Sequence, residues 1–208
     1  MTLSDVLAAI KDFFLPPEED VNHIIFAGRV VVLIGLVVWG YRFITNTWQT
    51  TYVMTSFMHH INLPFHEAGH IIFSPFGRFM HVLGGSLGQL LMPLICLGAF
   101  LYPNRNPFAA SVALWWFAQS LMDLAPYIGD ARAGELPLLG GVTGSEVEDY
   151  HDWEVLLKMR GWLLCDHKIA TAAYTAGRWL MVLAFLWGAR VLWMQYKNLQ
   201  KMPNVEKQ

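Results

Sequence analysis

The chain has 208 residues, of which 55% are hydrophobic and only 14% are charged. A soluble domain usually carries about a quarter charged residues, so this balance indicates a membrane protein. The formal net charge of −2 gives no reason to expect a nucleic-acid partner. The two cysteines, Cys96 and Cys165, form neither a disulfide framework nor a CxxC metal knuckle.

The N-terminal stretch "MTLSDVLAAIKDFFLPPEED" predicts a short amphipathic helix that ends at Pro16 and Pro17. Its apolar side is formed by Val6, Ile10, Phe13 and Phe14. Such a helix could lie on a bilayer surface or pack against the rest of the protein, and both alternatives stay open.

Five later segments are long and apolar enough for a transmembrane helix, which needs about 20 mostly apolar residues. They are residues 24–44, 48–73, 79–102, 107–129 and 171–196. The second segment is the least hydrophobic, and Pro64 should kink it or restart it. The short polar links between the second and third and between the third and fourth segments imply antiparallel neighbours. There is no internal repeat, so we expect one domain over residues 1–208.

Residues 130–170 interrupt this apolar pattern with a Gly-rich stretch followed by an amphipathic one. The second part, "SEVEDYHDWEVLLKMRGWLL", predicts a surface helix that begins near Ser145 or at Asp152. The expected fold is therefore all-α, a polytopic membrane helical bundle. It has about five transmembrane helices, an amphipathic N-terminal helix and one extramembrane helix.

The motif "HEAGH" at residues 66–70 lies in the second apolar segment. Residues four apart share a face of a helix, so His66 and His70 present two imidazoles at a separation that Zn²⁺ accepts. Glu67 lies one step round the helix, where it can act as a general base toward a metal-bound water. This is the HExxH arrangement of zinc hydrolases. The alternative is a polar patch that faces a water-filled cleft or a subunit interface.

Two histidines do not complete a catalytic zinc site, which usually has three protein ligands and an open position. The candidates for the third ligand are Asp123, Asp130, His151 and Asp152.

The chain resembles the site-2 protease family of intramembrane zinc metalloproteases, especially its compact bacterial branch. The resemblance rests on "HEAGH" and on "DLAPYIGDA" at residues 123–131, with "GGSLGQ" between them, and covers roughly residues 50–135. In that family a later helix carries an Asn-x-x-Pro stretch followed by an Asp-Gly pair. The family's Asp is the third zinc ligand, and its Asn binds the backbone of the substrate.

Aligning Pro126 with the family proline implies that Asp130 is the third metal ligand and that Asp123 binds substrate. The sequence departs from the family pattern at Asp123, which replaces the asparagine, and at Ala131, which replaces the glycine. The spacing from proline to aspartate is also one residue short. His151 therefore remains the alternative third ligand.

The resemblance implies a zinc metallopeptidase that cleaves membrane-embedded or membrane-adjacent protein substrates, with Glu67 as the catalytic residue and Zn²⁺ as the cofactor. It also implies a multi-pass protein of a bacterial inner membrane, in contact with the lipid bilayer. Two alternatives remain: a non-catalytic metal-binding membrane subunit or assembly factor, and a zinc hydrolase that acts on lipids. The oligomeric state and the role of residues 131–170 stay open.

Overall fold

The computed structural model describes residues 2–15 and 21–201, and these form helices joined by turns and one long surface segment. No strand occurs among the described residues, apart from one isolated bridge between Pro137 and Thr143. The expectation of an all-α fold is therefore confirmed. Pro16 and Pro17, at which the first helix was predicted to end, lie outside the described residues.

Within the described part of the chain, four helices are long and apolar enough to cross a membrane. They are α2 (His23–Thr45), α4 (Arg78–Leu101), α5 (Pro107–Gly129) and the C-terminal Leu163–Lys201. The last comprises the short 3-10 helix η2 (Leu163–Cys165) and α7 (Asp166–Lys201). Mean hydropathy is highest for α2, in which only Gly40 and Phe43 are buried in the isolated chain.

The remaining segment that was expected to span, residues 48–73, is not among these four. Turns occupy most of its first part, and the helix α3 (Phe57–Phe73) has only 17 residues. At 1.5 Å per residue such a helix covers about 25 Å, short of the roughly 30 Å of a bilayer's hydrocarbon core. Pro64 lies inside α3 without ending it.

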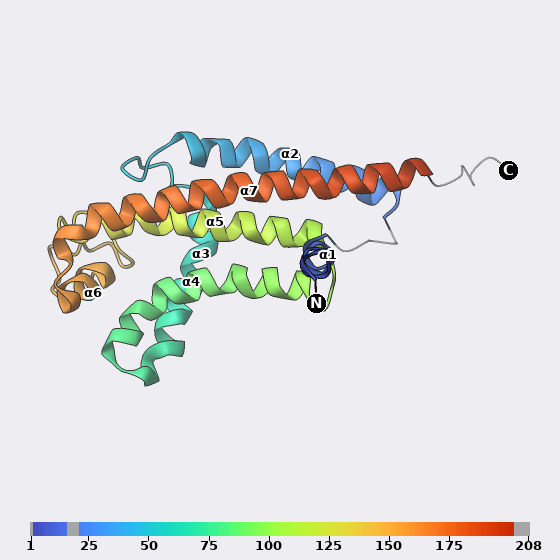
Figure 1. The fold of residues 1–208 in the computed structure, drawn as a ribbon. Helices are drawn as coiled ribbons and strands as arrows, with labels where there is room; N and C mark the ends of the chain where they lie inside the picture. The colour runs from blue at the N-terminus through green and yellow to red at the C-terminus, as the bar shows by residue number, and fades with distance from the viewer. Residues whose placement is uncertain (1, 16–20, 202–208) are drawn as a thin grey trace.

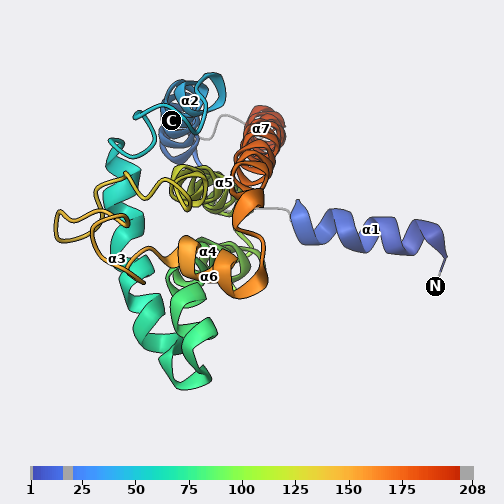
Figure 2. The same cartoon turned by 90° about the vertical axis from the view of Figure 1, so that its left-hand side faces the viewer.

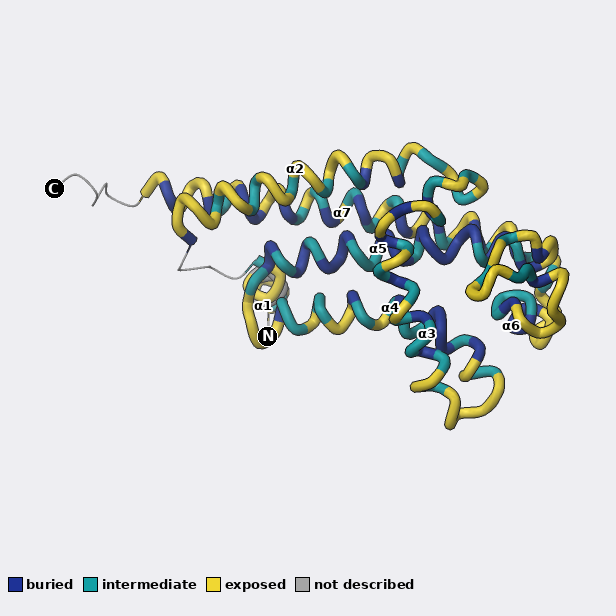
Figure 3. The backbone as a smooth tube through the Cα atoms, turned by 180° about the vertical axis from the view of Figure 1, so that it is seen from behind, coloured by how far each residue is buried: buried dark blue, intermediate teal, exposed yellow. Residues whose placement is uncertain are grey.

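The four long helices lie side by side, with α5 between α4 and α7 and with α2 against α7 (Figures 1 and 2). Most of α5 is buried, whereas α2 and α7 expose apolar outer faces (Figure 3). The core contains Phe43 of α2, Trp115 and Met122 of α5, and Tyr174 and Met181 of α7. The Tyr174 hydroxyl also donates a hydrogen bond to the carbonyl of Phe43 at 2.8 Å. Interior packing thus surrounds α5, and the outer helices present apolar surface to their surroundings.

Two shorter helices lie outside this layer of long helices. The helix α1 (Leu3–Phe14) projects away from the bundle (Figure 2), and its C-terminal end is held by a hydrogen bond from Trp187 Nε1 to the Phe14 carbonyl at 3.0 Å. The helix α6 (Asp152–Arg160) lies at the opposite end of the bundle (Figure 1). It begins at Asp152 rather than near Ser145.

The helix α3 runs across the long axis of the bundle and packs closely on α4 (Figure 2). Three glycines allow this contact, because a Cβ atom at Gly69 would lie 2.0 Å from the Gly84 carbonyl oxygen and one at Gly88 would lie 2.3 Å from that of Phe65. The short 3-10 helix η1 (Ser74–Phe76) then reverses the chain into α4. Glycine at these positions therefore sets how near α3 lies to α4.

We expect Gly88→Ala to destabilise the protein, because the new Cβ would meet a backbone oxygen that cannot turn aside. Overpacking of this kind costs about 1–3 kcal/mol. Denaturant unfolding in detergent, followed by helical circular dichroism, measures the effect. Gly98→Ala is the matched control on the same helix, because a Cβ there meets nothing within 4 Å. Equal stability of the two variants would contradict the close contact between α3 and α4.

Candidate metal centre

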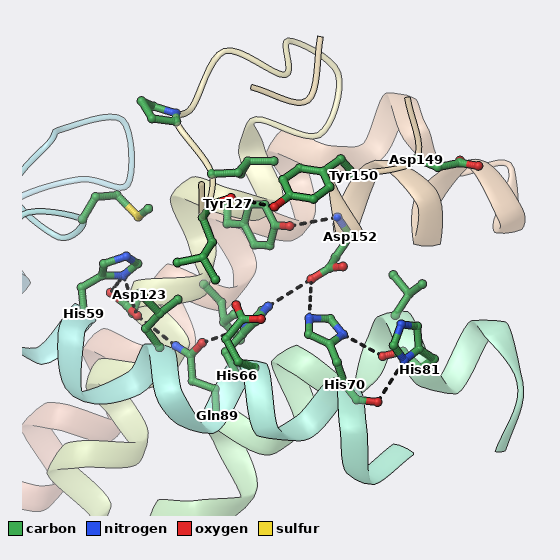
Figure 4. Close-up of a pocket in the computed structure, with 18 of the residues that line it drawn as sticks. His59, His66, His70, His81, Gln89, Asp123, Tyr127, Asp149, Tyr150 and Asp152 are labelled. Atoms are coloured by element: carbon green, nitrogen blue, oxygen red, sulfur yellow. Dashed lines mark hydrogen bonds and ion pairs between the residues drawn. The ribbon is translucent and has the colours of Figure 1, made fainter. Parts of the chain in front are cut away.

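A cavity of about 500 Å³ opens between α3, the facing parts of α4 and α5, and the surface segment that leads into α6 (Figure 4). His66, Glu67 and His70 line it from α3, and Asp152 lines it from α6. Its walls combine these polar groups with apolar side chains such as Leu63, Leu124 and Leu138. The HExxH motif thus faces a space large enough to admit part of another molecule.

His66 and His70 lie on one face of α3, with ring centroids 5.0 Å apart. Their Nε2 atoms approach the same carboxylate oxygen, Oδ2 of Asp152, at 3.0 Å and 3.2 Å. The ligand atoms of the three residues all lie within 4.8 Å of one another, so this group could hold a metal ion. Asp152, which completes the group, is the first residue of α6.

The Nδ1 atoms of both imidazoles also lie within hydrogen-bond distance of oxygen atoms. His70 Nδ1 lies 2.9 Å from the carbonyl oxygen of His81, and His66 Nδ1 lies 3.4 Å from Oε1 of Gln89. Because oxygens of this kind only accept hydrogen bonds, they favour a proton on Nδ1, so that Nε2 is the nitrogen that could bind a metal. Metal-binding histidines usually have such a partner on the nitrogen that is not bound to the metal. The surroundings of the two rings therefore fit a metal site.

Asp152 is suited to act as an anionic ligand. Burial by itself would raise the pKa of its carboxyl group, but the hydrogen bonds with His66 and His70 outweigh burial and hold the pKa below its usual range. Its backbone N–H donates to the Tyr127 hydroxyl at 2.9 Å. The next residue, Trp153, donates from Nε1 to Ser86 Oγ of α4 at 3.1 Å. These contacts fix the start of α6 beside the motif helix.

Gly85 of α4 forms the wall beneath the two imidazoles. A Cβ atom at this position would lie 2.5 Å from Nε2 of His66 and 2.5 Å from Nε2 of His70. The absence of a side chain here therefore leaves room for both ligand atoms.

The structure does not bring Asp130, the third ligand expected from the family resemblance, to the imidazole pair. Asp130 follows the end of α5, and its two carboxylate oxygens accept hydrogen bonds from the backbone N–H groups of Glu135 and Leu136, each at 3.0 Å. Burial would raise the pKa of this carboxyl group, but His151 and the two N–H groups lower it below its usual range. The α-helix continues through Pro126 to Gly129, and Asp130 then organises the turn that begins the surface segment.

His151, the alternative third ligand, is fully buried beside Asp130 rather than beside the imidazoles of α3. Its Nδ1 accepts a hydrogen bond from the backbone N–H of Glu154 at 3.2 Å and so caps α6, while its Nε2 lies 3.5 Å from Asp130 Oδ2. Its ring also packs on Tyr127, with centroids 4.3 Å apart. Asp130 and His151 thus contact each other and support the turn and helix start that hold Asp152.

Asp123, the expected substrate-binding residue, lines the other end of the cavity but is almost completely buried. Its carboxylate receives hydrogen bonds from Asn62 Nδ2 at 3.0 Å and from Gln89 Nε2 at 3.0 Å, and it lies 3.2 Å from His59 Nδ1. The side chain thus belongs to a buried polar network behind His66.

The structure adds Gln89 to the residues that the sequence pointed to. Of the four candidates for the third ligand, it places Asp152 beside the two imidazoles. Gln89 had a signal in the sequence, because an amide inside the apolar run of residues 79–102 needs a partner. The sequence signal for Asp152 was weak and consisted only of its place at the predicted start of a surface helix.

Removal of Asp152 tests the third ligand directly. We expect Asp152→Ala to weaken Zn²⁺ binding by more than about 100-fold, beyond the range for losing a residue that only supports a ligand. Asp130→Ala should weaken it less, because it loosens the turn but leaves all three ligand atoms. Asp12→Ala is the control, an exposed aspartate on α1 that pairs with Arg105 away from the cavity. Calorimetric titration of the metal-free protein measures all three. A larger loss for Asp130→Ala than for Asp152→Ala would contradict the arrangement.

Filling the space above Gly85 tests the same centre without removing a ligand. We expect Gly85→Ala to abolish stoichiometric Zn²⁺ retention, since the methyl group would occupy the position that both Nε2 atoms approach. Elemental analysis of the purified protein gives the metal content, and circular dichroism checks that the helices persist. Full metal content in folded Gly85→Ala would show that the imidazoles do not converge at this place.

Comparison with family models, with curated proteins and with solved structures finds no match for this chain. The likeness of its motifs to those of the site-2 protease family is therefore a resemblance of short sequence stretches. What the centre does must be inferred from its own geometry.

Proposed function

We propose that this protein is an intramembrane zinc metallopeptidase, which hydrolyses peptide bonds of protein substrates within or beside a membrane. One observation carries the proposal: His66, His70 and Asp152 converge from two separate helices on one point, in a cavity that Glu67 also lines. Two imidazoles and a carboxylate are a ligand set that catalytic zinc accepts, with a fourth position left for water.

The first contribution of the protein's own residues is to orient the imidazoles of His66 and His70. Hydrogen bonds from Nδ1 of His66 and His70 to oxygen acceptors hold both rings with Nε2 facing Oδ2 of Asp152. A zinc ion held by these three residues would act as a Lewis acid that lowers the pKa of water and polarises a substrate carbonyl.

Glu67 follows His66 directly and is partly exposed to the cavity, so it can reach water that the cavity admits. In the proposed reaction its carboxylate takes a proton from the attacking water and transfers it to the amine that leaves. General base catalysis of this kind contributes about 10²- to 10⁴-fold to a rate. None of the three candidate ligands is then required to move a proton.

The surroundings of the centre favour a membrane-associated substrate. The four long apolar helices support an integral membrane location, and the cavity has apolar walls on both α3 and the surface segment. A peptide bond inside a helix is shielded by hydrogen bonds, so a substrate must be locally extended to be cut. The motif resemblance supports peptide rather than lipid hydrolysis.

The variant Glu67→Gln tests this function. It keeps the shape of the side chain and all three candidate ligands but removes the base, so we expect normal zinc content and a loss of cleavage of about 10²- to 10⁴-fold. Mass spectrometry of new protein N-termini in membrane fractions measures cleavage, with cells that carry the wild-type chain as reference. Glu135→Gln, at an exposed position of the surface segment, is the matched control.

Three results would contradict the proposal. Unchanged protein termini would favour a metal-binding membrane subunit without catalysis. A change in lipid species instead of protein termini would indicate a lipid hydrolase. Absence of zinc from the purified wild-type protein would remove the basis for either kind of zinc enzyme.

A further inference from the structure

A network of polar side chains lies buried behind His66, between α3, α4 and α5. It consists of Asn62 from α3, Gln89 from α4, and Gln119, Ser120 and Asp123 from α5, with His59 of α3 at its edge. Buried polar groups without partners are destabilising by about 1–3 kcal/mol each, so a network of this size in a helical core needs explanation.

The hydrogen bonds around Asn62 leave only one orientation for its amide. Its Oδ1 accepts from Trp116 Nε1 at 2.9 Å and from Ser120 Oγ at 3.2 Å. Its Nδ2 donates to Gln119 Oε1 at 2.9 Å and to Asp123 Oδ2 at 3.0 Å. Because indole N–H only donates and a carboxylate only accepts, a reversed amide would lose these bonds.

The same reasoning determines the orientation of the Gln89 amide. The carboxylate of Asp123 and the backbone carbonyl of Ser120 both approach one end of the Gln89 amide, at 3.0 Å and 3.3 Å. Both groups are acceptors, so this end must be the NH₂ group. The amide oxygen is therefore turned toward His66, where it lies 3.4 Å from Nδ1.

An oxygen facing Nδ1 selects one tautomer of His66, the one with its proton on Nδ1 and its lone pair on Nε2. Asp152 works in the opposite direction in the metal-free protein, because its carboxylate lies 3.0 Å from Nε2 and favours a proton there. Gln89 is thus the group that favours the metal-binding tautomer of His66. Asp123, the nearer of its two acceptors, determines together with the Ser120 carbonyl which end of Gln89 faces the ring.

The second histidine offers an internal comparison. The Nδ1 atom of His70 faces a backbone carbonyl, that of His81, at 2.9 Å. A backbone carbonyl cannot reverse, so the tautomer of His70 needs no side-chain network. Only His66 depends on side chains of α4 and α5.

We propose that Asp123 is a positioning residue, which acts through Gln89 to hold His66 as the Nδ1-protonated tautomer that binds the metal. The proposal rests on the metal centre of the proposed function and deepens it. One oxygen of Asp123, Oδ2, accepts from both Asn62 Nδ2 and Gln89 Nε2, so the same atom orients both amides. The interaction with substrate that the motif resemblance implied for Asp123 is not required.

A set of variants tests this chain of hydrogen bonds. Asp123→Ala removes the carboxylate that orients Gln89, and Gln89→Leu removes the acceptor beside His66 Nδ1. Asp123→Asn is the conservative variant, because an asparagine oxygen in the place of Oδ2 can still accept from Asn62 Nδ2 and Gln89 Nε2.

We expect Asp123→Ala and Gln89→Leu each to weaken Zn²⁺ binding by about 10- to 100-fold, the range for losing a partner of a metal-binding histidine. Asp123→Asn should keep most of the affinity. Long-range ¹H–¹⁵N spectra of histidine-labelled protein should show the Nδ1–H signal of His66 lost in Asp123→Ala and Gln89→Leu and kept in Asp123→Asn. The signal of His70 should stay unchanged in all of them.

Two controls separate this effect from general damage. Asp12→Ala makes the same chemical change as Asp123→Ala at an exposed aspartate, where it should alter neither zinc affinity nor the His66 signal. Gln89→Leu removes only the acceptor and should lose the His66 signal in a protein that still folds. It keeps the test informative if the gap left by Asp123→Ala prevents folding.

The outcomes distinguish this proposal from the proposed function. If wild-type protein binds zinc but Asp123→Ala keeps both the His66 signal and the zinc affinity, the positioning role of Asp123 is wrong and the metal centre stands. An unchanged His66 signal in Gln89→Leu would lead to the same conclusion. If wild-type protein binds no zinc at all, both proposals fail together.

Discussion

The close contact between α3 and α4 is the constraint on which the centre depends. Gly69, Gly84 and Gly88 let the two backbones approach to a distance at which no other side chain fits. The approach leaves both imidazoles over Gly85, with their ligand atoms turned to the same point. The centre is therefore specified as much by missing side chains as by the residues that carry donor atoms. Larger residues at these four positions would separate the helices and the two rings.

Several features of the fold and of the site follow from the sequence alone. High hydropathy over about 20 residues predicts long apolar helices wherever it is sustained, and four such helices are present among the described residues. The spacing of His66 and His70 predicts two rings on one face, as the structure shows, because it depends only on helical geometry within one turn. The fifth expected span, residues 48–73, is not among the four long helices, because residues 48–56 form turns and α3 has only 17 residues.

The third donor could not be derived in this way. Its position depends on how residues 131–151 fold back over the bundle, and that path is set by tertiary contacts. The turn at Asp130, the cap formed by His151 and the packing of Trp153 on α4 all contribute to it. The motif resemblance pointed to Asp130, which lies where this surface segment begins. A local pattern does not show that Asp130 binds backbone N–H groups while Asp152 lies beside the imidazoles.

The attachment of Asp152 to α6 has a consequence for how the molecule is held together. Two donors belong to α3, but the third belongs to a short helix at the end of the bundle, so a bound ion would cross-link the surface segment to the helical layer. The ion would therefore reinforce one part of the chain selectively. Its removal would leave the surface segment held only by its hydrogen bonds and packing, while α2, α4, α5 and α7 keep their mutual contacts.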